Sequence, residues 1–213
     1  MGKLMKAEFY KLQKLASVRM IFLFSLVVGI LRGFSPHSGY QVYIIGLVPE
    51  LFDAVLISVF TAAFLCTEFS RRTFGNAFLC GTLRQNVFFA KLGVYFPGLL
   101  ALILLPLVVS TSVVTMRNGF GADWDAVALE MAEKLFFYIF YQFSMAGFAV
   151  LSASIIQKTI GTLGISVAGI YLMSLGQNLV EHLFTWDVWI ISITEIAVFL
   201  SVATFIFIRR DLK

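Results

Sequence analysis

The chain is poor in charge and in the residue types that build metal and disulfide sites. Charged residues make up 13% of its 213 residues, whereas a soluble domain carries about a quarter. It has two cysteines and two histidines, and they form no cluster with metal-ligand spacing. The phosphate-binding pattern G-x-x-x-x-G-K-[ST] is also missing. We therefore expect no metal, no bound cofactor and no ATP hydrolysis by this chain itself.

Sets of catalytic residues inside apolar segments are missing too. An intramembrane protease needs a Ser/His or a paired-Asp arrangement within its spans. His37 and His182 both fall in predicted outer loops, and Asp53 has no second aspartate within a span. An enzyme is therefore not expected.

What the chain does have is long, continuous apolar sequence. Hydrophobic residues make up 60% of it, and the mean hydropathy is +0.92. Several runs reach or approach the roughly 20 residues that cross a hydrocarbon core as a helix, and they lack the alternation of a barrel strand. We predict an all-α polytopic membrane protein with one domain and six transmembrane helices, at about 18–34, 43–66, 92–116, 135–156, 162–180 and 188–208.

Two of these spans carry irregularities. Arg32 interrupts the first span, and we expect it to reach the outer interface by snorkelling. Pro49, Glu50 and Asp53 leave a second arrangement open for the second span, in which the helix begins later, after a re-entrant or interfacial piece. In the fourth span we interpret the stretches YQFSMAGF and LSASII as packing residues.

Lysine and arginine predict the orientation. Thirteen of the sixteen fall on one side of the six spans, and only Arg32, Arg117 and Lys134 fall on the other. The positive-inside rule then places both termini in the cytosol. Nucleic acid is not an expected partner, because the basic residues lie beside apolar spans and not in one soluble patch.

The segment 68–91 is the one basic, aromatic stretch between two apolar runs. Most of its phenylalanines share one half of a predicted helix, and Arg71 and Arg72 share the other, with Glu68 placed to pair with either arginine. We predict a short amphipathic helix on the cytosolic face. It is either an interfacial anchor that binds membrane lipid or a docking helix for a protein partner, and the physics of the segment does not separate the two.

The same segment resembles type-2 ATP-binding-cassette (ABC) transporter permeases. In this family an acidic residue closes the second span, and a basic pair, Thr, small residues, Gly-x-x-Arg and a Lys follow. The matching positions here are Glu68, Arg71, Arg72, Thr73, Gly75, Gly81, Arg84 and Lys91. The opening LMKAEFYKLQKLASV is similar to the family's amphipathic entry helix, placed here at 3–17, with an apolar stripe of Met5, Phe9, Leu12 and Ala16. The end of the chain, Ile208 to Lys213, resembles the family's usual finish.

The resemblance implies a function and a set of partners. Two six-span permeases pair as a homodimer or heterodimer in the bacterial cell membrane, and each docks on a separate ATP-binding subunit that carries ATP and Mg. The docking residues would be Glu68, Arg71, Arg72, Thr73, Phe74, Phe78 and Arg84. Family members export lipid-linked sugars, drugs or peptides, and small members similar to this chain belong to bacteriocin or antimicrobial-peptide export and immunity systems.

Polar residues inside the spans are candidates for a substrate path. Glu50, Asp53 and Glu195 fall in the predicted outer half, where carboxylates usually face a cavity or a partner. Either they form an acidic cavity for a cationic peptide or amphiphile, or Glu50 and Asp53 lie at the outer interface and Glu195 is protonated or hydrogen-bonded in the bundle. Gln177 and Asn178 in the fifth span lie either at a dimer contact and exit path or in ordinary packing.

A second class of function stays open. The chain could be a non-transport membrane protein, a sensor or assembly factor whose basic loop binds anionic lipid or a signalling partner. An adjacent reading frame for a P-loop ATPase would favour transport over this alternative.

Overall fold

The computed structural model describes residues 2–48, 51–67, 84–181 and 188–209, and within these ranges it contains helices and no strand. The helical content agrees with the all-α prediction. The elements in chain order are α1 (Gly2–Lys14), α2 (Ala16–Arg32), α3 (Gly39–Gly46), α4 (Leu51–Thr61), the π-helix η1 (Ala62–Cys66), α7 (Arg84–Asn118), α8 (Trp124–Ile156), α9 (Thr159–Glu181) and α10 (Val188–Arg209).

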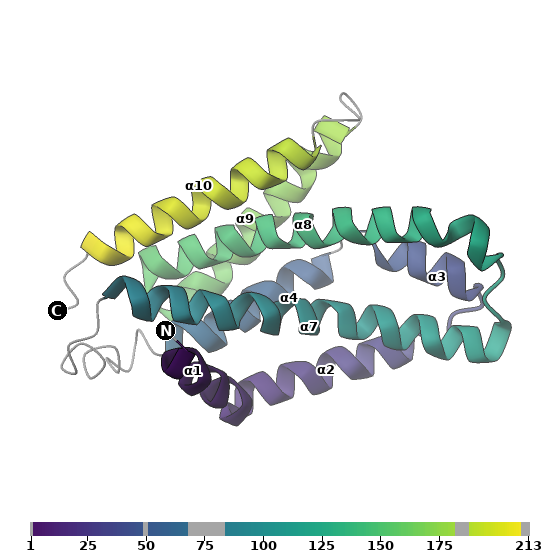
Figure 1. The fold of residues 1–213 in the computed structure, drawn as a ribbon, viewed down its shortest axis with the longest axis horizontal. Coiled ribbons are helices and arrows are strands. Elements are labelled where there is room, and N and C mark those ends of the chain that lie inside the picture. Colours follow the sequence, from purple (N-terminus) through teal and green to yellow (C-terminus); the bar gives the residue numbers. More distant parts are fainter. Residues whose placement is uncertain (1, 49–50, 68–83, 182–187, 210–213) are drawn as a thin grey trace.

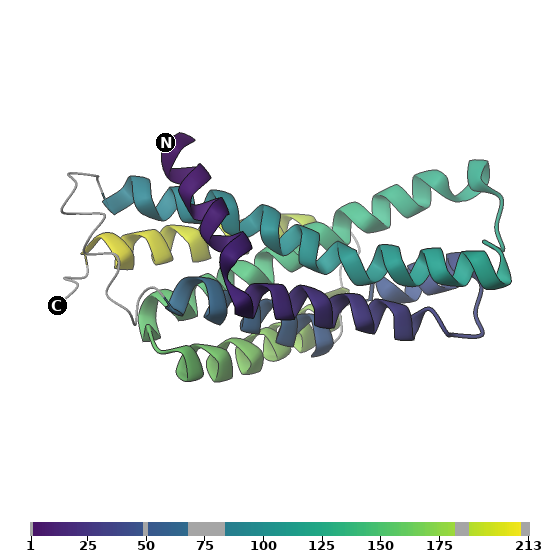
Figure 2. The ribbon, with the colours of Figure 1, turned by 90° about the horizontal axis from the view of Figure 1, so that it is seen from below.

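Successive long elements run in alternate directions along the longest axis (Figures 1 and 2). The N-terminal helix α1 and the end of α10 lie in the same half of the molecule, and the turn between α7 and α8 lies at the opposite end. The cavity and the junction described below therefore lie toward opposite ends of one bundle.

Among the described residues, three helical stretches are long and apolar enough to cross a membrane: Gln85–Asn118, Trp124–Ile156 and Ile191–Arg209. Two bent pairs, α1 with α2 and α3 with α4–η1, also have the required length and composition if each pair is one span. The apolar stretch Thr159–Met173 of α9 is shorter. A chain with three to five such elements is a multi-pass membrane protein.

The helix boundaries differ from the predicted spans in ways that follow from sequence. The entry helix ends at Lys14, and a bend of 64° at Leu15 separates it from α2. The stretch predicted as a second span from residue 43 divides into α3 and α4, which is the arrangement with a later helix start. The helix predicted over 135–156 begins already at Trp124 and is 33 residues long, because the acidic segment before it continues the same helix.

Helix α7 is continuous from Arg84 to Asn118 although it contains Pro97 and Pro106. A proline inside a helix has no N–H to give to the carbonyl four residues earlier, which for Pro106 is the carbonyl of Leu102. The hydroxyl of Ser25 on α2 donates to that carbonyl at 3.1 Å. A Cβ atom on Gly29 would lie 2.9 Å from the Cα of Pro106, so α2 also needs a glycine to pack this closely. Pro106 therefore marks the contact between α7 and α2.

Candidate functional site

A buried ion pair joins α1 to α7. The Glu8 carboxylate lies 3.1 Å from the Lys91 ammonium, and their side chains are 4% and 1% exposed. Lys11, on the outer side of α1, binds the other oxygen of Glu8 at 2.7 Å. Removing one member of a buried pair leaves an uncompensated charge and costs about 3–5 kcal/mol. The pair therefore fixes α1 against the first turns of α7.

The π-helix completes this junction. The Lys91 ammonium lies 5.2 Å from the centre of the Phe64 ring in η1, close enough for a cation–π contact. Phe64 stacks near Tyr95, whose hydroxyl shares a 2.7 Å hydrogen bond with Thr61 at the end of α4. A π-helix of one turn is uncommon and frequently marks a functional site. We define Glu8, Lys91 and Phe64 as the junction of α1, η1 and α7.

Two elements of the junction flank the predicted docking segment in sequence. The helix η1 lies just before the residues 68–83, which are outside the described ranges, and α7 begins just after them at Arg84. The predicted docking residues Glu68, Arg71, Arg72, Thr73, Phe74 and Phe78 lie outside the described residues, and Arg84 opens α7. Residues 68–83 therefore connect η1, which holds Phe64, to α7, which holds Lys91.

The apolar stripe of α1 is not the face that α1 turns toward the bundle. Leu12 is buried, but Met5 and Phe9 are 39% and 52% exposed, and Ala16, just after α1, is exposed. The buried or half-buried positions are Leu4, Glu8, Leu12 and Leu15. The inward face therefore carries Glu8 toward Lys91 and leaves Met5 and Phe9 outside the bundle.

Asp53 lies inside the bundle with its own hydrogen-bond donors. It is 6% exposed and accepts hydrogen bonds from the Tyr138 hydroxyl at 3.1 Å and from the Gln142 amide at 3.0 Å. Both donors belong to α8. A carboxylate in hydrocarbon needs such partners, and here they tie α4 to α8. Glu50, the neighbouring candidate, lies outside the described residues.

Glu195 lies on a different side of α8 from Asp53. The Ser144 hydroxyl donates a hydrogen bond to the Glu195 carboxylate, which is half-buried in α10. Gln142 and Ser144 are two residues apart, which turns their side chains to nearly opposite sides of a helix. The structure therefore does not bring Asp53 and Glu195 together. Gln177 and Asn178 lie near the C-terminal end of α9.

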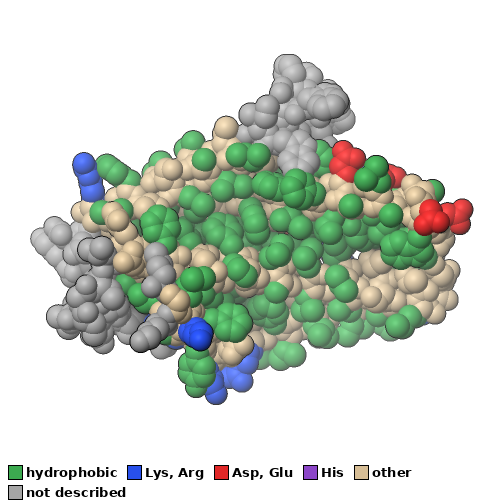
Figure 3. Space-filling view, viewed as in Figure 1, with side chains coloured by type: hydrophobic (Ala, Val, Ile, Leu, Met, Phe, Trp, Pro, Cys, Tyr) green, Lys and Arg blue, Asp and Glu red, His purple; other side chains and the backbone are tan. Residues whose placement is uncertain are grey.

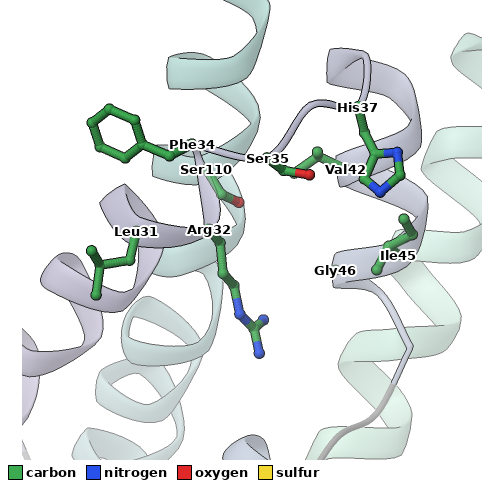
Figure 4. Close-up of a pocket in the computed structure, with 9 residues that line it drawn as sticks. All are labelled: Leu31, Arg32, Phe34, Ser35, His37, Val42, Ile45, Gly46 and Ser110. Carbon is green, nitrogen blue, oxygen red and sulfur yellow. The ribbon is translucent and has the colours of Figure 1, made fainter.

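A cavity of about 470 Å³ lies between the end of α2, the loop that follows it, α3 and α7 (Figure 4). Its described lining includes Arg32 and His37 but neither Asp53 nor Glu195. The Arg32 guanidinium lies 5.1 Å from the centre of the Phe52 ring. The Arg32 side chain therefore reaches from the cavity to the first turn of α4, which also holds Asp53.

Exposed charge divides along the bundle. Lysine and arginine side chains gather in the half that holds α1, and acidic side chains gather at the start of α8 (Figure 3). The exposed basic residues of the first half include Lys6, Lys14, Arg19, Lys158 and Arg209, and the acidic residues of the other end are Asp123, Asp125, Glu130 and Glu133.

Comparison with protein-family models, curated proteins and solved structures finds no match to this chain.

Sequence reasoning missed the partners of the charged residues. Glu8 is the only acidic residue before Glu50, and such an isolated acid in a basic segment is the signal that could have pointed to a buried partner. Gln142 and Ser144 lie in the stretch that we interpreted as packing residues. Their roles could not be read from sequence, because they depend on which face of α8 meets α4 and α10.

Proposed function

We propose that this chain is the membrane-spanning permease subunit of an ATP-driven exporter of the ABC class. It would cross the bacterial cell membrane six times with both termini in the cytosol, pair with a second permease chain and dock on a separate ATP-binding subunit. Its substrate would be a peptide or another amphiphile. The ATP and Mg would be bound by the partner, and this chain would convert the partner's closure into movement of its helices.

The junction of α1, η1 and α7 carries this proposal. A docking segment transmits force only if both of its ends are attached to rigid elements. Here η1 precedes the segment and α7 follows it, and Lys91 contacts both Phe64 in η1 and Glu8 in α1. A pull on the segment would then act on α1, η1 and α7 together.

The division of charge supports the orientation. Basic residues gather in the half with α1, where the positive-inside rule would place the cytosol. The docking segment would then face the cytosol, where an ATP-binding subunit would reach it.

Co-purification with an ATPase tests the proposal. The neighbouring reading frames are first searched for a P-loop ATPase; that ATPase is then expressed with the chain, and the complex is isolated in detergent by a tag on the ATPase. We expect the two proteins to purify together, and we expect the combined Phe74→Ala and Phe78→Ala change or Arg72→Ala to reduce the recovered complex severalfold. Lys134→Ala, at the other end of the bundle, is the matched control and should not change recovery.

The competing function gives a different result. If the segment is only an interfacial anchor of a sensor or assembly factor, the same variants will weaken membrane binding of the isolated segment and no ATPase will be retained. That result would overturn the transport proposal.

A further inference from the structure

A groove of about 460 Å³ lies between α1 and the first half of α7. Figure 2 shows α1 lying across α7 in this part of the bundle. The wall that α1 contributes includes Met5, Lys6 and Phe9, whereas Glu8 is buried on another face of the helix against Lys91. The groove is therefore separate from the junction of α1, η1 and α7, although α1 and α7 take part in both.

The inner surface of the groove is apolar, and a glycine keeps it open. Gly93 and Pro97 line it from α7. A Cβ atom on Gly93 would lie 3.1 Å from the terminal carbon of Met5, so a larger side chain at this position would occupy the groove. Met5 and Phe9 are partly exposed and stand in one row on α1, because they are four residues apart. This row and Pro97 form a wall suited to a hydrocarbon chain.

The rim of the groove carries positive charge. Lys6 lines the groove, is exposed, and pairs with no carboxylate in the part of the chain that the structure describes. The Lys14 ammonium lies 5.6 Å from the centre of the ring of Tyr10, which also lines the groove. Glu8, the one acidic residue in the sequence of α1, is turned inward and bound by two lysines. An anionic head group therefore fits this rim.

The α7 wall adds a hydrogen-bond acceptor. Pro97 has no N–H to give to the carbonyl of Gly93, four residues earlier. This carbonyl lies between two residues that line the groove, whereas the corresponding carbonyl before Pro106 receives the Ser25 hydroxyl. The Gly93 carbonyl suits a hydroxyl group of a lipid head.

The bend before α2 brings the groove to the surface of a membrane. The axes of α1 and α2 differ by 64°, so α1 lies near the plane of the bilayer surface if α2 crosses close to the normal. A helix in that plane holds apolar side chains at the edge of the hydrocarbon and lysines at the level of the phosphates. The groove then opens where lipid head groups meet acyl chains.

We propose that this groove binds one anionic glycerophospholipid of the surrounding membrane, with its phosphate beside Lys6 and one acyl chain over Gly93. Free phosphate lacks the chain, and a zwitterionic lipid brings a cation to the lysine rim, so neither matches both parts of the groove. The inference goes beyond the export function and does not rest on it, because it needs only that the chain lies in a membrane. The lipid would hold α1 against α7 from outside the bundle.

Native mass spectrometry of the purified, delipidated chain tests this inference. The chain in a neutral detergent is titrated with phosphatidylglycerol, with phosphatidylcholine that has the same acyl chains, or with glycerol phosphate. We expect one phosphatidylglycerol to bind at concentrations where the other two probes scarcely bind. Lys6→Gln should weaken phosphatidylglycerol about fivefold, which corresponds to the roughly 1 kcal/mol that one lysine contributes near an anionic membrane surface.

Matched variants separate the groove from general attraction between charges. Lys158→Gln removes an exposed lysine outside the groove and should leave binding unchanged. Gly93→Leu fills the groove without changing its charge and should abolish binding, and leucine favours a helix more than glycine does. Gly164→Leu is its control, because a Cβ atom there meets nothing within 4 Å. Lys6 is exposed, so Lys6→Gln keeps the test decisive even if Gly93→Leu fails to fold.

Equal losses for Lys6→Gln and Lys158→Gln would overturn the inference, and so would equal binding of the two lipids or binding of glycerol phosphate as tight as that of phosphatidylglycerol. A folded Gly93→Leu that keeps the lipid but loses a dimer would assign the groove to a second copy of the chain and overturn it as well. Failure of the ATPase to co-purify would remove the export function and leave the lipid measurement intact. The two proposals can therefore fail separately.

Discussion

At the residue scale, the pair of Glu8 and Lys91 decides how α1 attaches to the bundle. Both side chains are almost completely buried, so neither can recover hydration when its partner is removed. Lys11 binds the same carboxylate from a half-exposed position, where solvent screens its charge. Glu8 and Lys91 therefore contribute more to the stability of the fold than Lys11 does, although both lysines bind the Glu8 carboxylate.

We predict that Glu8→Ala lowers the free energy of unfolding by about 3–5 kcal/mol, since it leaves the Lys91 charge buried without its carboxylate. Replacing both residues together, Glu8→Leu with Lys91→Met, should restore most of the loss, because well-packed apolar residues can replace a buried pair. Lys11→Ala is the matched control and should cost no more than about 1 kcal/mol. Thermal unfolding in detergent measures all three, and equal losses for Glu8→Ala and Lys11→Ala would contradict the buried pair.

The same residues show how far the site could be predicted. Asp53 and Glu195 stand out in sequence because carboxylates are rare in apolar runs, and both carry hydrogen bonds in the structure. Their placement on different sides of α8 depends on helix rotation, which composition does not fix. Sequence presents Lys91 only as one position of the family pattern, since its partner Glu8 lies more than eighty residues away in the chain.

At the scale of elements, α7 shows how a helix with two internal prolines stays continuous. Sequence predicts the apolar run from 92 to 116 but not the hydroxyl of Ser25 that donates to the carbonyl of Leu102. For α3 and α4 too, the sequence indicates where the helices break but not the long-range hydrogen bonds that orient them. The sequence offers Pro49 as a break, whereas the direction of α3 depends on its hydrogen bonds with Gly119 and Phe120, which are distant in the chain.

We predict that Gly29→Ala destabilises the contact of α2 with α7. The added Cβ would lie 2.9 Å from the Cα of Pro106, a backbone atom that cannot rotate away, and such overpacking typically costs about 1–3 kcal/mol. Gly164→Ala is the matched control, because a Cβ there meets nothing within 4 Å and alanine favours a helix by roughly 0.5–1 kcal/mol. The melting temperatures in detergent should therefore shift in opposite directions, and a shift of the same sign and size in both variants would contradict the close packing at Pro106.

At the scale of the whole molecule, the arrangement of charge and the alternating helix directions agree with the proposed topology of six crossings. Basic residues gather in the half with α1, and the acidic start of α8 lies at the other end (Figure 3). If α2, the pair α3–α4, α7, α8, α9 and α10 each cross the membrane once, the chain returns to the side from which it started. Because the apolar stretch of α9 is shorter than those of α7, α8 and α10, an even number of crossings requires that α9 also spans the membrane.

We predict that both termini lie on one side of the membrane and the turn before α8 lies on the other. In a background with Cys66→Ala and Cys80→Ser, single cysteines are introduced as Gly2→Cys, Lys213→Cys and Asp123→Cys. An impermeant maleimide should label Asp123→Cys in intact cells and should label the two terminal variants only after permeabilisation. Labelling of one terminus alone in intact cells would mean an odd number of crossings. In that case at least one of α2, the pair α3–α4 and α9 would not span the bilayer, and the docking segment and the cavity at Arg32 would have to be reassigned relative to the two faces of the membrane.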